Sequence, residues 1–288
     1  MNQISRILLL IIVSFAGFLT AHAVPDYPTL QGKASRFYAN KEWTSALAMY
    51  ELMLEQKPKE LPVYAHAIVA CGMIKDHELQ FKFMERTEKV GLALDSVFNY
   101  VRNESFALSH PEVYEKFLIL LKSRQNWLVR NVNTQLLYYY TFRSDADNMI
   151  AMAEMLLKST PDNILYLQTM GDAYCLKGDL ATGMKWYKKV LEYEPHNYNA
   201  LITLGNYYNI IVRNKLKYFT NELSKMPNPT EISINLLTSE DQTFIKQNAN
   251  EAIAYLAEAY AIIPTPYISK MLDNLRSITT PTHKRKAK

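Results

Sequence analysis

Glycine is scarce in this sequence, with 8 among 288 residues. Glycine supplies the tight turns and bulges that β-sandwiches and barrels need, so its scarcity favours helices. An excess of one charge is also lacking, because 32 Lys and Arg residues stand against 28 Asp and Glu residues, for a net charge of +4. Nucleic-acid-binding proteins concentrate Lys and Arg on one face. The near balance of charge therefore predicts no nucleic-acid partner.

Motifs that carry chemistry are missing as well. The sequence contains no Gly-rich phosphate loop, no HExxH zinc motif and no GxSxG nucleophile motif. Among the 6 histidines, no two stand three or four residues apart, which is the spacing of a helical metal pair. We therefore expect neither an enzyme nor a protein with a metal or cofactor.

One long apolar run is present, at the N-terminus. Arg6 precedes an unbroken run of apolar and small residues from Ile7 to Leu19, and the sequence AHA then ends at Ala23. This order is typical of a secretory signal peptide. The run is shorter than the ~20 residues of a transmembrane helix. We expect residues 1–23 to be a signal peptide and the mature chain to be exported, to the periplasm or outside the cell, without a transmembrane segment. An uncleaved anchor is the alternative.

A pattern with a period of 34 residues fills the middle of the chain. The residues that recur are Leu167, Met170, Gly171 and Tyr174, which return as Leu201, Leu204, Gly205 and Tyr208, and Pro161, which returns as Pro195. An apolar residue, then Leu-Gly and Tyr, and later a small residue, an aromatic residue and Pro, form the tetratricopeptide signature. The segment Ile164–Tyr208 resembles this family. The resemblance implies an all-α fold, a right-handed solenoid of antiparallel helix pairs.

Weaker copies extend the pattern towards the N-terminus. Pro58 stands three periods and one residue before Pro161, so repeats fill the gap almost in register. In the gap we predict two divergent helix pairs, Leu61–Val90 and Asp95–Lys122, the second broken at 109–111. The solenoid is expected to cover residues 24–279, and a disordered basic tail to cover 280–288.

The last repeat departs from the period. The spacing between Gly205 and Pro264 exceeds that of the repeat by about one whole unit. The segment Asn199–Lys225 is continuously apolar-periodic, and Ser239, as an N-cap, predicts a second helix that ends at Ile263. These two helices are expected to form an extended antiparallel pair.

The excess residues then form an insertion at about 213–246, with Pro227–Thr238 at the tip of the pair. A helix over Tyr267–Ile278 is expected to cover the last apolar face, as solenoids require. Both the extended pair and the opening unit are similar to those of exported tetratricopeptide proteins of Bacteroidetes.

The resemblance also implies a concave groove, lined by the first helix of each pair, in which family members hold a peptide or a helix. The repeat register places ten side chains in this groove, mostly amides, hydroxyls and aromatics. They are Asn131, Thr134, Tyr138, Gln168, Asp172, Cys175, Asn199, Ile202, Asn206 and Asn209. Amides both donate and accept hydrogen bonds, so they suit a peptide backbone. We expect a scaffold in the cell envelope that binds a protein or peptide.

Other roles were weighed against this one. A structural or assembly component that acts through the extended last pair is the alternative. The basic clamp of chaperone-binding relatives is missing, because Gln31 and Ser35 stand at two groove positions of the first unit. An enzyme or a glycan-binding protein has no support in the sequence.

The two cysteines raise the question of a disulfide, since exported proteins form them. By the register, Cys71 and Cys175 both stand late in the first helix of a pair, three repeats apart. Packed helices are about 8–10 Å apart, so three repeats exceed the ~7 Å limit between the Cα atoms of a disulfide. We therefore expect two free thiols.

Overall fold

A computed structural model describes residues 25–125, 128–224 and 239–279, which form helices joined by turns and, within these ranges, no strand. The chain divides into two compact units, residues 1–129 and residues 130–288. We call them the first and the second unit. The predicted signal peptide, the tip of the extended pair and the basic tail lie outside the described residues. No helix in the described ranges is both long enough and apolar enough to cross a membrane.

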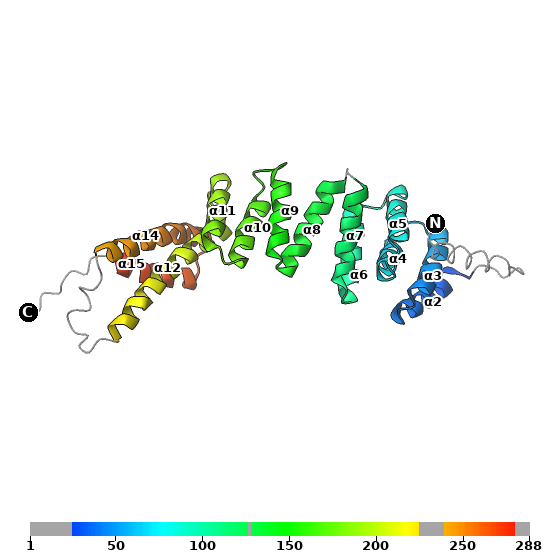
Figure 1. The fold of residues 1–288 in the computed structure, drawn as a ribbon, viewed down its shortest axis with the longest axis horizontal. Coiled ribbons are helices and arrows are strands. Elements are labelled where there is room, and N and C mark those ends of the chain that lie inside the picture. The colour runs from blue at the N-terminus through cyan, green and yellow to red at the C-terminus, as the bar shows by residue number, and fades with distance from the viewer. Residues whose placement is uncertain (1–24, 126–127, 225–238, 280–288) are drawn as a thin grey trace, which may run out of the picture. The chain divides into compact units, whose positions relative to one another are not determined.

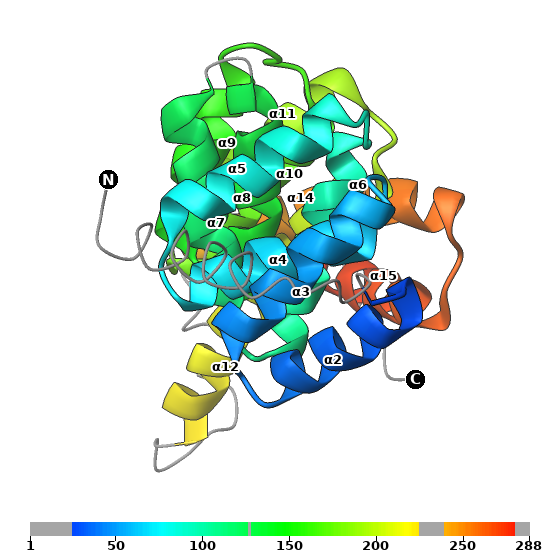
Figure 2. The same ribbon diagram turned by 90° about the vertical axis from the view of Figure 1, so that its right-hand side faces the viewer.

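In its described residues, the first unit contains three helix pairs (Figure 1 and Figure 2). They are α2 (Tyr27–Ala39) with α3 (Trp43–Gln56), α4 (Leu61–Met73) with α5 (His77–Lys89), and α6 (Leu94–Ala107) with α7 (Pro111–Arg124). The second and third pairs confirm the divergent repeats predicted from the sequence, including the break between α6 and α7. Helix α4 is the centre of this unit, because it packs against α3, α5, α6 and α7 and most of its side chains are buried.

The second unit begins with two pairs of the same kind and ends with the extended pair. Its helices are α8 (Val129–Arg143), α9 (Ala146–Leu157), α10 (Ile164–Leu176), α11 (Leu180–Tyr193), α12 (Tyr198–Ser224), α14 (Ser239–Ile262) and α15 (Pro266–Thr279). The long helices α12 and α14 pack side by side, and α15 packs on α14 (Figure 1). The predicted extended pair and capping helix are thus confirmed, with helix ends within one or two residues of those expected.

The turns inside the pairs keep the 34-residue period that much of the sequence has lost. One residue with a positive φ angle ends the first helix of each of five pairs, at intervals of 34 or 35 residues. These residues are Lys41, Lys75, Ser109, Ser144 and Gly178. In each turn the next backbone amide donates to the carbonyl five positions earlier, which is the Schellman helix end. The repeat is therefore a property of the backbone in the first unit as well.

Crossing glycines bring the helices of the last two pairs close together. A Cβ atom on Gly171 would lie 2.7 Å from the ring of Tyr187 on α11. A Cβ atom on Gly205 would lie 2.6 Å from Leu256 on α14. Any larger side chain would push the paired helices apart, which explains why glycine recurs here.

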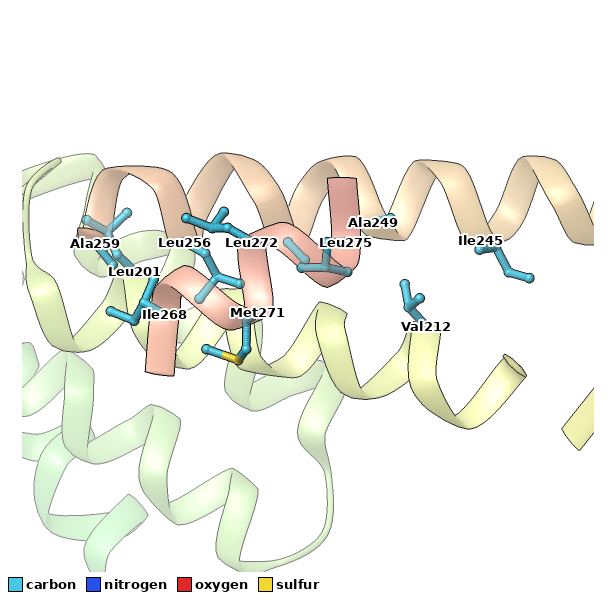
Figure 3. Packing of buried hydrophobic residues seen from close by; sticks show 11 residues of the cluster. Leu201, Val212, Ile245, Ala249, Leu256, Ala259, Ile268, Met271, Leu272 and Leu275 are labelled. Carbon is cyan, nitrogen blue, oxygen red and sulfur yellow. The ribbon is translucent and has the colours of Figure 1, made fainter. Parts of the chain in front are cut away.

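The core of the extended pair is closed by α15. Apolar side chains of α12, α14 and α15 form one buried cluster (Figure 3). Its members are Leu201, Val212, Ile245, Ala249, Ala252, Leu256, Ala259, Ile268, Met271, Leu272 and Leu275. Helix α15 therefore covers the apolar face that the last pair would otherwise expose, as a solenoid cap should.

Candidate functional site

The candidate site is a face of the second unit, formed by the first helices of its three pairs, α8, α10 and α12. Residues four apart on a helix stack one above the other, so residues i, i+4 and i+8 form a stripe. Three such stripes stand at the same repeat positions, and we call their nine side chains the groove grid. They are Thr134, Tyr138 and Phe142 on α8, Gln168, Asp172 and Leu176 on α10, and Ile202, Asn206 and Ile210 on α12.

Hydrogen bonds tie these three helices together near their N-terminal ends. The hydroxyl groups of Thr134 on α8 and Tyr166 on α10 are 3.4 Å apart. The amide of Gln168 on α10 donates to Oδ1 of Asn197 at 3.0 Å. The same oxygen accepts the backbone N–H of Ala200, so Asn197 also caps the start of α12. Neighbouring stripes of the grid are therefore held in register.

Nine of the ten side chains expected in the groove keep some exposure. Asn131, Tyr138, Asp172 and Asn199 are exposed, and the other five are half-buried: Thr134, Gln168, Cys175, Ile202 and Asn206. Asn209 differs from the expectation, because it is only 8% exposed. Its amide donates to the sulfur of Met271 on α15 at 3.4 Å. The capping helix covers this position, so Asn209 is not open to a partner.

Asp172 has a structural role in addition to its place in the grid. One of its carboxylate oxygens accepts a hydrogen bond from the hydroxyl of Tyr187 on α11. Burial, together with this negative neighbour, raises the pKa of Tyr187 above its ordinary range, so the phenol keeps its proton. The single acidic group of the grid is therefore held by its own helix pair.

Three exposed apolar side chains of the grid were missed in reading the sequence. They stand 34 residues apart, each at the C-terminal end of its stripe: Phe142 is 71% exposed, Leu176 54% and Ile210 51%. We call these three residues the apolar ladder. The repeat register shows an apolar residue at this position on all three helices, but not its exposure, and the expected groove positions on α10 and α12 stopped one residue earlier, at Cys175 and Asn209.

Basic side chains flank the ladder. Arg143 and Lys177 directly follow Phe142 and Leu176, and Arg213 comes one helical turn after Ile210. All three are exposed, and Lys177 forms an ion pair with Asp147 on α9. The polar middle of the grid thus passes into an apolar and basic edge.

The thiol of Cys175 points towards α11. A Cβ atom on Gly183 would lie 2.6 Å from this sulfur, and burial raises the pKa of the Cys175 thiol. Both cysteines are free in the structure, as predicted, and Cys71 is completely buried in α4. Among the described residues, no cluster of three or more His, Cys, Asp or Glu side chains is placed to hold a metal ion.

The first unit offers a different surface at the corresponding repeat positions. On α4 the first two positions of the stripe are Ala65 and Val69, and both are buried. On α2 they are the exposed Gln31 and Ser35. The apolar ladder of the second unit has no counterpart in α2 and α6, where the equivalent residues are Ala39 and Ala107.

Comparison with known proteins finds no matching family model and no matching curated protein. Solved structures do match. One is a protein described as protein-binding from Bacteroides ovatus, with TM-score 0.51 and 16% identity, covering 76% of this chain and 98% of that chain. At this identity the likeness concerns the fold alone.

Two further matches are tetratricopeptide proteins. One is from Bacteroides fragilis, with TM-score 0.38, 15% identity and coverage of 88% of this chain and 99% of that chain. The other is the C-terminal part of a protein from Cytophaga hutchinsonii, with TM-score 0.40, 15% identity and coverage of 90% and 97%.

Proposed function

We propose that this chain, whose 34-residue sequence repeat and helix pairs resemble those of tetratricopeptide proteins, is a non-catalytic scaffold. Its second unit binds a segment of a partner protein or peptide on the groove grid. The observation that carries the proposal is the grid itself. Side chains that keep some exposure recur at identical repeat positions on three helices of the second unit, five of the nine being exposed and four half-buried.

The polar side chains of the grid suit the backbone of a bound segment. Asn206 presents an amide at the middle position of its stripe and Gln168 at the first position of its own, and Asn131 and Asn199 present amides at the N-terminal edge of the face. An amide can pair with both the N–H and the C=O group of an extended or frayed chain. The Oδ1 atom of Asn206 is buried and has no hydrogen-bond partner among the described residues. A donor from a partner would satisfy it after a small side-chain movement.

The proposal places the protein in the cell envelope, after export. The support is the signal-peptide pattern that ends at Ala23. Mass spectrometry of the protein from its native host tests this part. An N-terminus near Val24 is expected, and an intact Met1 would contradict export with cleavage.

Site-specific photo-crosslinking tests the binding role. A photoreactive amino acid is placed at Asn199, which is exposed on the groove side of α12, and in a second protein at Lys185, which is exposed on α11. The groove position is expected to capture one discrete partner in the native host, and the control position is not. Capture from Lys185 with none from Asn199 would overturn the assignment of the groove.

The extended pair supports a second role, in assembly. Tyr218 on α12 is 59% exposed and Phe244 on α14 is 43% exposed, although both belong to the part of the pair beyond the repeat. Aromatic side chains are enriched where proteins meet. Changing both residues to Ser should abolish partner capture only if the pair, rather than the grid, is the binding surface.

A further inference from the structure

The apolar ladder is an unusual surface for a repeat protein that has a well-covered core. Phe142, Leu176 and Ile210 each expose more than half of their surface. They come from three separate repeats, yet they stand at one repeat position, so the exposure is systematic. Contiguous exposed apolar groups mark interaction sites far more often than isolated ones do.

From this surface we propose that the partner segment is an acidic amphipathic α-helix, whose apolar side chains lie along the ladder. This inference rests on the binding role proposed above and adds the chemistry of the partner. Two features of the ladder, its spacing and its charged border, select this occupant.

The spacing favours a helix over an extended chain. Hydrogen bonds join α8 to α10 and α10 to the N-cap of α12, and packed helices stand about 8–10 Å apart, so we take neighbouring ladder residues to be separated by about that distance. A helix rises 1.5 Å per residue, and residues seven apart lie on one face about 10 Å apart. An extended strand instead returns to the same face every ~6.7 Å, or every ~13 Å for two such steps. The spacing of apolar residues at every seventh position of a helix therefore matches the spacing of successive ladder residues.

The charged border selects an acidic partner. Arg143 and Lys177 directly follow ladder residues, Arg213 comes one helical turn after Ile210, and all three are exposed. The acidic groups near the ladder are engaged within the protein, because Asp172 accepts from Tyr187 and Asp147 pairs with Lys177. Asp145 and Asp179 accept backbone N–H groups as the N-caps of α9 and α11. Glu or Asp residues that flank the apolar stripe of the partner would meet Arg143 and Arg213, and Lys residues there would be repelled.

The first unit provides an internal comparison. Where α8, α10 and α12 carry Phe, Leu and Ile, helices α2, α4 and α6 carry Ala39, Met73 and Ala107. The alanines of α2 and α6 would leave a helix without anchors, and Met73 on α4 is half-buried. The second unit alone is therefore expected to bind the segment.

Two synthetic peptides test the proposal on the full mature chain. Both are fluorescein-labelled 18-residue helices. Leu stands at every seventh position and at the neighbouring positions of the same helix face, so that one apolar stripe runs along each peptide. One carries Glu at the remaining charged positions and the other carries Lys. By fluorescence anisotropy the Glu peptide is expected to bind about tenfold or more tightly than the Lys peptide, with the difference shrinking at high salt.

Point variants locate the binding surface. Leu176→Ser and Ile210→Ser are expected to weaken binding of the Glu peptide about fivefold or more, because each removes an apolar anchor. The control is Leu180→Ser, which changes an exposed leucine on α11, and it should alter binding less than about twofold. Circular dichroism of each variant checks that the helices remain folded. Equal binding of the two peptides, no binding of either at millimolar concentration, or no effect of the ladder variants would overturn the proposal.

Failure here can be told apart from failure of the binding role. If the Asn199 crosslinker captures a partner, and Leu176→Ser and Ile210→Ser do not reduce that capture, the groove binds but the ladder does not select an amphipathic helix. If Asn199 captures nothing, the binding role itself fails.

Discussion

The ring of Tyr187 occupies the space that a side chain on Gly171 would need. An added Cβ atom would lie 2.7 Å from Cε2 and 2.8 Å from Cδ2 of this ring. The hydroxyl of the same ring donates a hydrogen bond to the carboxylate of Asp172, the next residue on α10. The ring is therefore fixed at both ends by one turn of α10, and it cannot rotate away without losing that bond. The close crossing of α10 and α11 and the position of the Asp172 side chain in the groove grid therefore both depend on the placement of the Tyr187 ring.

Gly171→Ala should destabilise the second unit. The clash with a fixed ring costs about 1–3 kcal/mol, and the better helix propensity of Ala returns only about 1 kcal/mol. We expect a net loss of up to about 2 kcal/mol in the free energy of unfolding. Urea unfolding followed by the fluorescence of Trp186, which belongs to α11, measures it. Changing Trp43 and Trp127 to Phe leaves Trp186 as the only tryptophan, since the sequence has 3.

Gly32→Ala is the matched control. Gly32 also lies within a helix, α2, but an added Cβ atom would meet nothing within 4 Å. Only the propensity gain remains, so this change should stabilise the first unit by about 0.5–1 kcal/mol. The crossing argument is wrong if both substitutions have the same sign.

A carboxylate in the first unit should make its stability fall in acid. Glu104 on α6 accepts a hydrogen bond from Tyr38 on α2 at 2.9 Å and lies 3.2 Å from Nε2 of His66 on α4. The hydrogen bond from His66 holds the pKa of Glu104 below its ordinary value of 4.5. A lowered pKa in the folded state contributes stability above pH 4.5, and that contribution is lost as the pH falls through the folded pKa.

Glu104→Gln isolates this contribution. At pH 6 the variant should be about 1 kcal/mol less stable than the wild type, because Gln keeps an acceptor for Tyr38 but loses the charge. Below pH 4.5 the two proteins should converge. Urea unfolding at a series of pH values, followed by Trp43 fluorescence, gives the difference. A gap that widens as the pH falls would contradict the assignment.

The capping helix should carry much of the stability of the extended pair. Leu272 on α15 is buried in the cluster with Leu256 and Val212 (Figure 3). Its neighbour Asp273 is exposed. Leu272→Ala should cost about 2–4 kcal/mol in the second unit, because it leaves a cavity. Asp273→Ala should change stability by less than about 0.5 kcal/mol. Thermal and urea unfolding of both variants test the cap, and equal effects would mean that α15 does not close the core.

Much of the fold could be predicted because the repeat leaves a sign both in the sequence and in the backbone. In the second unit the sequence shows the repeat through Gly171, Tyr174 and Pro195, whereas the first unit has lost such residues. There the backbone keeps the period: Lys75 and Ser109 adopt positive φ angles although neither is glycine. Residues without a branched Cβ, such as Lys and Ser, can do so at modest cost when the surrounding helix end fixes the angle, and the sequence then gives little sign of the turn.

The extended pair could be located because the sequence there lacks a residue that suits the expected turn. One period after Gly178 the next turn is due at Val212, but Val212 lies buried inside α12, and the helix continues to Ser224. A β-branched apolar residue cannot easily supply the positive φ angle of that turn.

The apolar ladder escaped prediction because exposure depends on what packs nearby. Leu176 and Leu167 are the same residue type on one helix, and only the structure separates the exposed one from the buried one.

The two thiols should differ in reactivity. Cys71 is completely buried, and burial raises its pKa far above the ordinary range, whereas Cys175 is partly exposed. A thiol reagent should modify Cys175 in minutes to hours and Cys71 only when the first unit unfolds, since the thiolate is the reactive form. Mass spectrometry of the labelled sites in native protein and in urea measures this. Equal labelling of both in the native state, or no free thiol in urea without reductant, would contradict the structure.

We expect Asn206 to favour partner binding and to lower the stability of the second unit. Its Oδ1 atom is buried without a hydrogen-bond partner among the described residues, and an unpaired buried acceptor costs about 1–3 kcal/mol. Asn206→Leu, of similar volume, should therefore leave the second unit as stable or more stable by about 1 kcal/mol, measured by Trp186 fluorescence in urea. The same change should weaken capture of the partner by the Asn199 crosslinker, because it removes the central amide of the grid. The comparison variant Gln168→Leu, which breaks a satisfied hydrogen bond to Asn197, should lose stability as well as binding. A protein keeps a residue that costs stability where function requires it, so opposite effects of the two substitutions on stability would mark Asn206 as a contact for the partner.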